Sequence, residues 1–233
     1  MVPKEETLLI VYCGYRDWAL NSFVELKKAF EFPGGKVQLQ LVTSQDNLLS
    51  LFEHGIRPDL VLCAGWSWII PKTELKLSRF FGIHPSDLPL YAGGTPLQHQ
   101  IIDGLTATKV SLFELNSEID SGPIVNKTPL SLDGSLEKIL SELSKKTTFL
   151  FSRLIEAFPN VSYIQSSSAG HSQLKKKRLQ PTSGQITTEK LGQMTVKELY
   201  NFVRCREYPY PHAYFQDHTG KLEIERVVFI DSD

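Results

Sequence analysis

His84 is the side chain of this sequence that is best placed for proton chemistry. It follows the apolar run 79–83, which reads as a strand, and it precedes a loop rich in proline and glycine. Open α/β sheets place ligand-handling groups where a strand ends and its loop begins. An imidazole there can donate, accept or carry a proton near neutral pH. The alternative is a structural histidine that caps the strand end and is satisfied by backbone groups.

Asp120 is the acid that the chain order brings to the same edge of the sheet. It follows another predicted strand, 110–115, so its carboxylate should lie near His84. An acid beside a histidine fixes the tautomer of the ring and favours its charged form. Spacing alone leaves a second interpretation open, because many acids at strand ends are helix caps or turn formers.

Residues 65–71, with the sequence GWSWIIP, form a bulky apolar loop after the predicted strand 60–64. One interpretation is a slot for a flat heterocycle, in which backbone groups supply hydrogen bonds. The alternative is that the same side chains pack in the core beneath the loop.

Two basic features are candidates for anion binding. Gly14 and Arg16 follow the first predicted strand, but a lone glycine is not a G-x-G-x-x-G motif, which argues against a dinucleotide site. Arg16 can meet a phosphate or carboxylate with two parallel hydrogen bonds, or it can be solvated. The basic run 175–178 either holds a polyanionic substrate or is ordinary solvated surface.

Alternating strands and helices must position these residues. Apolar runs and helical spacing predict strands over 7–12, 37–42, 60–64, 79–83, 110–115 and 124–130, and helices over 18–30, 47–54, 95–102 and 135–158. This order predicts an α/β fold with a mostly parallel sheet, helices on both faces and a hairpin-like edge pair. Thr95 is expected to cap the helix that begins at Pro96. Ligands should bind at the carboxyl ends of the first, third and fourth strands.

The composition of the chain changes after Pro159. Residues 165–170 are small and polar and precede the basic run, which is typical of a linker or an ordered surface loop. We therefore divide the chain into a domain over 1–160 and a smaller C-terminal α/β region over 161–233.

The C-terminal region contains two local signals. Thr195 and Glu198 form a capping box for a helix that ends near Arg206. A turn at 217–220 separates two strand-like runs and predicts a terminal hairpin.

The composition limits the classes of function. With 233 residues, 41% hydrophobic and 22% charged, the chain can form one large domain with an appendage. A net charge of -1 gives no global basic field for nucleic acid or an anionic membrane. We see no signal peptide and no membrane span, and we expect a cytoplasmic protein without a metal site. The cysteines form no C-x-x-C pair and read as buried apolar residues in a reducing compartment: Cys13, Cys63 and Cys205.

Together, these residues resemble the 10-formyltetrahydrofolate-dependent formyltransferase family over roughly 7–158. The string HPSDLPLYAGGTP, at 84–96, is similar to the family signature H-P-S-x-L-P-x-Y-R-G-x-x-P. The string EIDSGPI, at 118–124, resembles a second signature built around L-D-x-G. The segment 204–215, together with the loops after the first and third strands, looks most like bacterial sugar N-formyltransferases.

The resemblance implies a Rossmann-like formyltransferase domain that moves a formyl group from 10-formyltetrahydrofolate to a primary amine. His84 would stabilise the tetrahedral oxyanion or pass a proton, and Asp120 would hold His84 charged and accept the proton of the amine. The implied donor-binding residues are Ser67, Trp68, Ile69, Ile70, Asn116, Ser117, Glu118 and Ile119. The implied acceptor-binding residues are Gly14, Tyr15, Arg16, Ser86, Gly93, Gly94 and Tyr210.

Two positions depart from the family pattern. Gly82 stands where the family usually has an asparagine whose amide donates to the oxyanion. Loss of one such donor costs about 2.7–4 kcal/mol of transition-state stabilisation. Ala92 stands where the signature commonly has arginine. A folate-binding protein with weak or lost catalysis is therefore kept as an alternative.

The resemblance of the segment 204–215 favours an acceptor amine on a nucleotide-linked amino sugar. Methionyl-tRNA is an alternative acceptor, which the net charge of -1 and the short C-terminal region disfavour. Glycinamide ribonucleotide is another, which would leave that segment unexplained. We expect no nucleic-acid or membrane partner, and a homodimer is one alternative for the oligomeric state.

Overall fold

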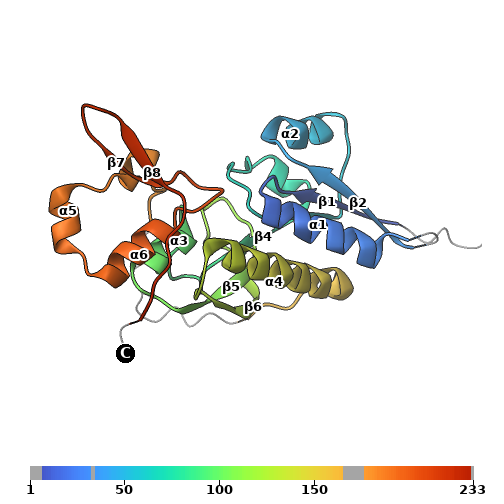
Figure 1. Cartoon of the computed structure of the whole chain (residues 1–233). Coiled ribbons are helices and arrows are strands. Elements are labelled where there is room, and N and C mark those ends of the chain that lie inside the picture. Colours follow the sequence, from blue (N-terminus) through green and yellow to red (C-terminus); the bar gives the residue numbers. More distant parts are fainter. Residues whose placement is uncertain (1–6, 33–34, 165–175, 232–233) are drawn as a thin grey trace, which may run out of the picture.

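A six-stranded sheet organises the computed structural model, which describes residues 7–32, 35–164 and 176–231. The strand order is β2-β1-β3-β4-β5-β6 (Figure 1). The strands are β1 (Leu8–Cys13), β2 (Val37–Val42), β3 (Leu60–Cys63), β4 (Arg79–His84), β5 (Ala107–Glu114) and β6 (Ile124–Ser131). β1 pairs in parallel with β2 and β3, and β3 pairs in parallel with β4. β5 runs antiparallel to β4 and β6, so the predicted sheet and its edge pair are confirmed.

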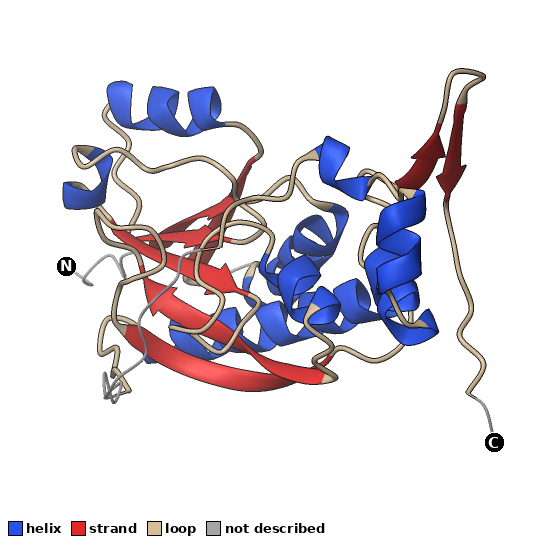
Figure 2. Cartoon of the chain, turned by 90° about the vertical axis from the view of Figure 1, so that its left-hand side faces the viewer, coloured by secondary structure: helices blue, strands red, loops and turns tan. Residues whose placement is uncertain are grey.

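Helices cover both faces of this sheet, as predicted (Figure 2). α1 (Asp17–Phe30), α3 (Pro96–Ile102) and α4 (Leu136–Ala157) pack on one face. α2 (Gln45–Glu53) and the short η1 (Glu74–Lys76) pack on the other. Alternate side chains of each strand enter opposite cores, which explains why β1 and β3 are apolar throughout.

The alternation of β4 decides where His84 points. Phe81 belongs to the core beneath α1 and α4, whereas Phe80 belongs to the core beneath α2. Gly82 and His84 share the face of Phe80, because side chains two residues apart in a strand point the same way. The site is therefore built on the α2 side of the carboxyl edge.

Side-chain caps decide where the helices begin. Ser44 accepts a hydrogen bond from the N–H of Asn47, so α2 begins at Gln45, slightly earlier than predicted. Thr95 stands at the N-cap position of α3, as predicted, but its side chain makes no cap. Its Oγ1 instead accepts a hydrogen bond from the N–H of Leu179 at 3.1 Å. The predicted capping role of this side chain is therefore wrong.

The C-terminal elements pack at the end of the molecule opposite β2 and α2 (Figure 1). They are η2 (Pro181–Gly184), α5 (Thr188–Gln193), α6 (Val196–Arg204), β7 (Ala213–Gln216) and β8 (Lys221–Ile224). The capping box of Thr195 and Glu198 and the terminal hairpin are both confirmed. α6 ends slightly earlier than predicted.

Buried polar groups tie this region to the sheet domain. Arg204 donates to the carbonyls of Leu132 and Gly134 at 2.8 and 3.0 Å. The carboxylate of Glu207 accepts from the N–H of Leu136, the first residue of α4, at 2.9 Å. These bonds hold the chain that leads into Tyr208 against the start of α4. The division of the chain at residue 160 stays a prediction.

The cysteines occupy the buried positions that their apolar surroundings predict. Cys13, Cys63 and Cys205 are all buried and unpaired. Burial raises the pKa of the Cys205 thiol to about 11, so this group stays a neutral thiol near pH 7. Within the described ranges, no helix has both the length and the apolar character needed to cross a bilayer.

Candidate active site

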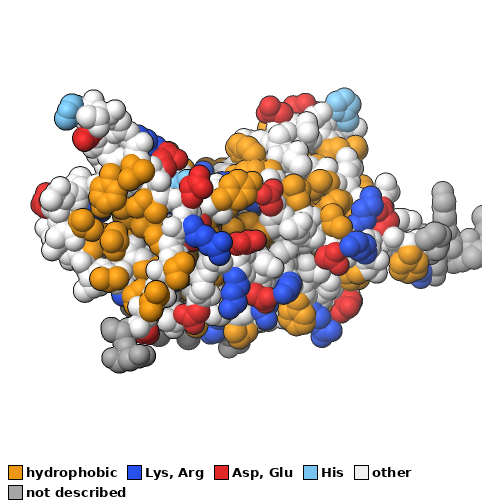
Figure 3. Space-filling model, in the orientation of Figure 1, with side chains coloured by type: hydrophobic (Ala, Val, Ile, Leu, Met, Phe, Trp, Pro, Cys, Tyr) orange, Lys and Arg blue, Asp and Glu red, His pale blue; other side chains and the backbone are white. Residues whose placement is uncertain are grey.

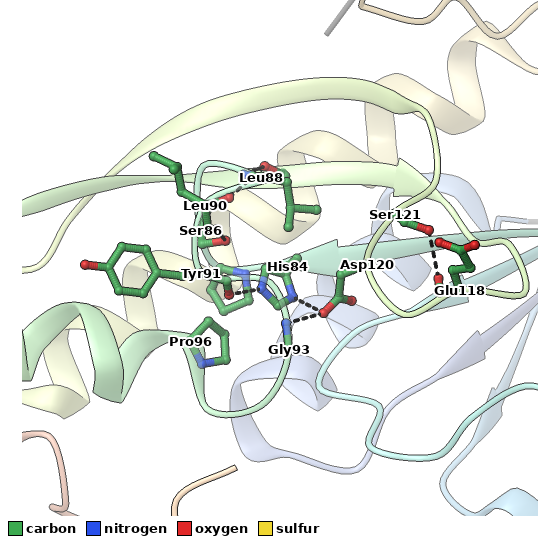
Figure 4. A network of polar contacts seen from close by, with 12 residues as sticks. His84, Ser86, Leu88, Leu90, Tyr91, Gly93, Pro96, Glu118, Asp120 and Ser121 are labelled. Carbon is green, nitrogen blue, oxygen red and sulfur yellow. Dashed lines mark hydrogen bonds and ion pairs between the residues drawn. The ribbon is translucent and has the colours of Figure 1, made fainter. Parts of the chain in front are cut away.

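His84 and Asp120 meet at the carboxyl end of β4 (Figure 4). The His84 Nδ1 lies 3.6 Å from the Asp120 Oδ2, and the His84 side chain is only 8% exposed. The other ring nitrogen, Nε2, lies 3.0 Å from the carbonyl oxygen of Tyr91. The predicted proximity of the two residues is confirmed, and their roles in the reaction stay predictions.

The hydrogen-bond partners assign the protons of this pair. A carbonyl oxygen only accepts, so Nε2 of His84 carries a hydrogen and donates it to Tyr91. A proton on Nδ1 therefore points at Asp120. The Oδ2 of Asp120 also accepts from the N–H of Gly93 at 2.7 Å. Within the described residues, the Oδ1 of Asp120 has no hydrogen-bond partner, so this oxygen is available to a ligand.

Strained backbone surrounds the pair. Tyr91, Thr95 and Asp120 have φ values of 55°, 50° and 53°, and they are the non-glycine residues with positive φ in the described parts of the chain. Each such residue costs of order 1–3 kcal/mol and persists only where its surroundings hold it. Such strain is common at functional sites, and here it lies in the two loops that face His84.

The tryptophan loop exposes part of its apolar surface and buries the rest. Trp68 and Ile69 are 37% and 69% exposed, which suits the predicted slot. Ile70 is 6% exposed and packs in the core beneath α2. The Ile70 side chain is therefore directed into the core, and a contact of its backbone with the donor stays a prediction. Trp68 packs edge-to-face against Trp66 and at a tilt against Tyr15, with ring centroids 4.7 and 4.9 Å apart.

The loop 116–119 is exposed beside Asp120, and its own polar groups shape it. The Oδ1 of Asn116 accepts from the N–H of Glu118 at 2.9 Å and from the hydroxyl of Ser121 at 3.0 Å. The Asn116 side chain is thus used to hold the turn. Ser117, Glu118 and the half-exposed Ile119 are left to face a ligand.

A third group of side chains lies at the carboxyl end of β1. The Arg16 guanidinium carbon is 5.0 Å from the ring centroid of Tyr15 and 5.6 Å from that of Tyr210. The Tyr15 hydroxyl bonds that of Ser67 at 2.6 Å, which links this group to the tryptophan loop. No described carboxylate forms an ion pair with Arg16. Its positive charge is therefore held between aromatic rings and remains available to an anion.

Four of the predicted acceptor-binding residues also have structural roles, and their roles in binding stay predictions. Ser86 is fully buried, and its hydroxyl donates to the carbonyl of Leu90 at 2.7 Å. A Cβ on Gly14 would lie 2.9 Å from the carbonyl oxygen of Ala64. Close neighbours also surround the loop glycines, since a Cβ on Gly93 or Gly94 would lie 2.3 Å from Lys176 O or 2.7 Å from Arg178 Cα. These glycines permit close packing.

Local sequence patterns identify 175–178 only as a basic run and Tyr91 only as part of a signature, and they do not place the backbone of Tyr91 or of 176–179 in this site. Tyr91 contributes through its backbone carbonyl, which carries no residue-specific signal. Lys175 and the polar stretch 165–170 lie outside the described residues.

A family model described as Formyl transferase matches residues 32–154, more than half of the chain. The chain belongs to the formyl transferase family. The methionyl-tRNA formyltransferase of a Nitratiruptor species is 31% identical over 138 residues, which cover 57% of this chain and 44% of that protein. The chain spans 36% to 60% of the lengths of the first curated relatives that it matches.

Solved formyltransferase structures share the whole described fold. A methionyl-tRNA formyltransferase from Clostridium thermocellum superposes with a TM-score of 0.82 at 25% identity, covering 96% of this chain and 94% of that one. A sugar N-formyltransferase from Shewanella sp FDAARGOS_354 superposes with a TM-score of 0.74 at 15% identity, covering 97% and 99%.

The space beside Gly82 is already filled in this chain. A Cβ at this position would lie 2.7 Å from Leu115 Cδ1 and 3.1 Å from Phe113 Cε1. An asparagine amide therefore has no room there unless these apolar side chains move. Leu115 and Phe113 thus fill the volume that a larger side chain at position 82 would need.

Gly82→Asn should consequently destabilise the protein and leave it no more active. Overpacking of a core costs about 1–3 kcal/mol, and the new amide would face apolar side chains. Thermal unfolding of Gly82→Asn and of Gly82→Asn with Leu115→Ala would measure this, the second variant being the more stable of the two. A single variant that is as stable as wild type and gains activity would contradict the expectation.

Proposed function

We propose that this protein transfers a formyl group from 10-formyltetrahydrofolate to a primary amine. The observation that carries the proposal is the His84–Asp120 pair, which lies beside exposed aromatic and apolar side chains in a chain of the formyl transferase family. A histidine with an adjacent carboxylate can exchange protons with a reacting amine.

The two loops beside the pair suit a folate. Trp68 and Ile69 on one loop and Ile119 on the other expose apolar surface at the same sheet edge. A flat pterin can bury this surface and use backbone groups of both loops for hydrogen bonds. When bound, 10-formyltetrahydrofolate would supply the formyl carbon that the amine attacks, and tetrahydrofolate would leave as the bond from N10 to this carbon breaks and N10 takes up a proton.

His84, Asp120 and Gly93 then have distinct roles in the proposed reaction. The Nε2 hydrogen of His84 is used by the carbonyl of Tyr91, so Nδ1, which lies 3.6 Å from Asp120 Oδ2, is the nitrogen that exchanges a proton with Asp120. A ring protonated on both nitrogens adds positive charge that stabilises negative charge developing nearby. Asp120 receives the proton of the amine at Oδ1, because Oδ2 is engaged by Gly93 and faces His84. The bond from Gly93 keeps the carboxylate fixed during this exchange.

Arg16 and its two tyrosines favour an acceptor with an anionic group and a flat ring. The guanidinium can bind phosphate, and the rings of Tyr15 and Tyr210 can stack on a base or sugar. A nucleotide-linked amino sugar combines a base, phosphates and a primary amine. We therefore propose such a sugar as the acceptor.

Methionyl-tRNA is the second candidate acceptor. The names of the curated relatives and of the Clostridium thermocellum structure favour it. On the face drawn in Figure 3, however, positive and negative side chains are interspersed. A face of mixed charge offers little of the phosphate neutralisation on which binding of a long nucleic acid depends.

Purified protein should be incubated with 10-formyltetrahydrofolate and either a panel of nucleotide-linked amino sugars or methionyl-tRNA. Release of tetrahydrofolate and the mass of the acceptor would be followed together. A formylated sugar supports the proposal, and formylated methionyl-tRNA supports the second candidate. Tight folate binding without turnover of any amine would instead support the alternative of a binding protein with lost catalysis.

Arg16→Met should weaken acceptor binding without affecting the donor. Hydrogen bonds to charged groups are worth about 1.5–3 kcal/mol, which predicts an increase in KM for the acceptor of about 10–100-fold. The matched control is Arg57→Met, because Arg57 also stacks on an aromatic ring but precedes β3, at the opposite edge of the sheet. Equal KM values for Arg16→Met and wild type would show that this cation does not bind the acceptor.

A further inference from the structure

The C-terminal segment 176–179 runs along the loop that faces His84. Lys176 forms an isolated parallel bridge with Gly93. Its N–H donates to the carbonyl of Ala92, and its carbonyl accepts from the N–H of Gly94, both at 2.8 Å. This isolated bridge fixes the start of the segment against the loop.

Side chains fasten both ends of this contact. The hydroxyl oxygen of Thr95 accepts from the N–H of Leu179 at 3.1 Å. The Nε2 of His99 donates to the carbonyl of Lys177 at 2.9 Å. Each residue of the segment except Arg178 thus bonds the loop or the helix that follows it.

The Lys176 side chain adds an outer anchor. Its ammonium lies 3.6 Å from a carboxylate oxygen of Asp103 and 5.4 Å from the ring centroid of Tyr91. The Tyr91 hydroxyl donates to the same carboxylate oxygen at 2.9 Å. Burial and this carboxylate raise the pKa of Tyr91 to about 12, so the phenol keeps its proton at neutral pH.

Two hydrogen bonds connect the loop that the segment holds to Asp120 and His84. Gly93, bridged to Lys176 on one side, donates its N–H to Asp120 on the other. Tyr91, anchored through its ring and hydroxyl, accepts from His84 through its carbonyl. A shift of the segment would move the N–H and the carbonyl that orient the two catalytic side chains.

The backbone conformation shows why such support is needed. Tyr91 and Thr95 flank the bridged residues and have positive φ values, as does Asp120. A free loop would relax out of these conformations, because side chains disfavour them. The bonds from 176–179 supply the restraint.

We propose that the segment 176–179 is a positioning segment that holds Gly93 and Tyr91, and through them Asp120 and His84, in the reactive geometry. This inference rests on the proposed formyl transfer and extends it by making a segment far along the chain a part of the site. Thr95 and Gly94 are positioning residues in this arrangement, because they act through other residues.

Gly94→Ala tests the contact directly. Gly94 has no positive φ, so an added Cβ acts only by pushing on Arg178, 2.7 Å away. Gly192→Ala is the matched control, because nothing lies within 4 Å of its Cβ. In ligand-free protein, hydrogen exchange of peptides over 88–96 and 116–122 should accelerate in Gly94→Ala and not in Gly192→Ala. Unchanged exchange over 116–122 would overturn the proposal, and this readout does not depend on turnover.

Thr95→Val provides a second route if Gly94→Ala does not fold. Valine keeps the β-branched shape of threonine but cannot accept from Leu179, whereas Thr95→Ser keeps the acceptor. We expect kcat to fall about 10–100-fold in Thr95→Val, with the KM of the donor little changed, and to recover in Thr95→Ser. Equal kcat in both variants would overturn the proposal. Absence of turnover in the wild-type protein would instead remove the proposed function and leave the exchange experiment decisive.

Discussion

His84→Asn should lower kcat by roughly 10²–10⁴-fold, the range in which a positioned acid or base contributes. The asparagine amide can still donate to the carbonyl of Tyr91, so the loop keeps a partner. It cannot carry the mobile proton that the imidazole presents to Asp120 at 3.6 Å. The rate of tetrahydrofolate release at saturating concentrations of both substrates would give kcat.

The control for this variant must separate chemistry from folding. His54→Asn changes an exposed histidine at the end of α2 and should leave kcat unchanged. Calorimetry of folate binding should give the same affinity for His84→Asn and wild type, because the donor loops do not involve this ring. Full activity in His84→Asn would show that His84 has no catalytic role.

Asp120→Asn should have the second largest effect. Asparagine adopts positive φ more readily than other residues with side chains, so it tolerates the 53° of this position. Its amide oxygen can still accept from the N–H of Gly93. The substitution removes the basic oxygen that would receive the proton of the amine, and we expect kcat to fall by about 10²–10³-fold.

Two further variants separate the catalytic role of Asp120 from its structural role. Asp46→Asn changes an exposed acid in the first turn of α2 and should leave activity intact. Asp120→Ala loses the bond from Gly93 as well as the charge, so it should lower the thermal stability more than Asp120→Asn does. If Asp120→Asn kept wild-type kcat with both substrates, Asp120 would only hold the loop in place.

Local patterns along the chain are enough to predict the order of the elements and the edge at which the site lies. Apolar runs and helical spacing are local properties, so they predict β1, β3, β4 and the long α4 within a few residues. The sequence predicts that His84 and Asp120 lie close together, and the structure confirms it. β5 runs antiparallel to β4, however, and its end at Glu114 pairs with Phe81, so the loop after β5 must fold back to bring Asp120 to His84. The tertiary structure, and not a shared strand edge, therefore accounts for this contact.

The packing of distant segments determines which side chains near that edge are free to bind. Burial depends on residues far away in the chain, and so Ser86 and Ile70, which stand in suitable motifs, point into the protein. Gly93 and Gly94 look like a flexible turn in sequence but are packed against 176–178.

The largest contribution of the tertiary structure comes from the C-terminal region. Tyr210 reaches Arg16, and Lys176 bridges Gly93, although local patterns relate neither pair. Arg204 and Glu207 hold the chain that leads to Tyr210 against the start of α4, whereas backbone bonds to Ala92 and Gly94 hold Lys176. No periodicity encodes a backbone bond between segments so far apart, since every residue except proline offers the same N–H and carbonyl.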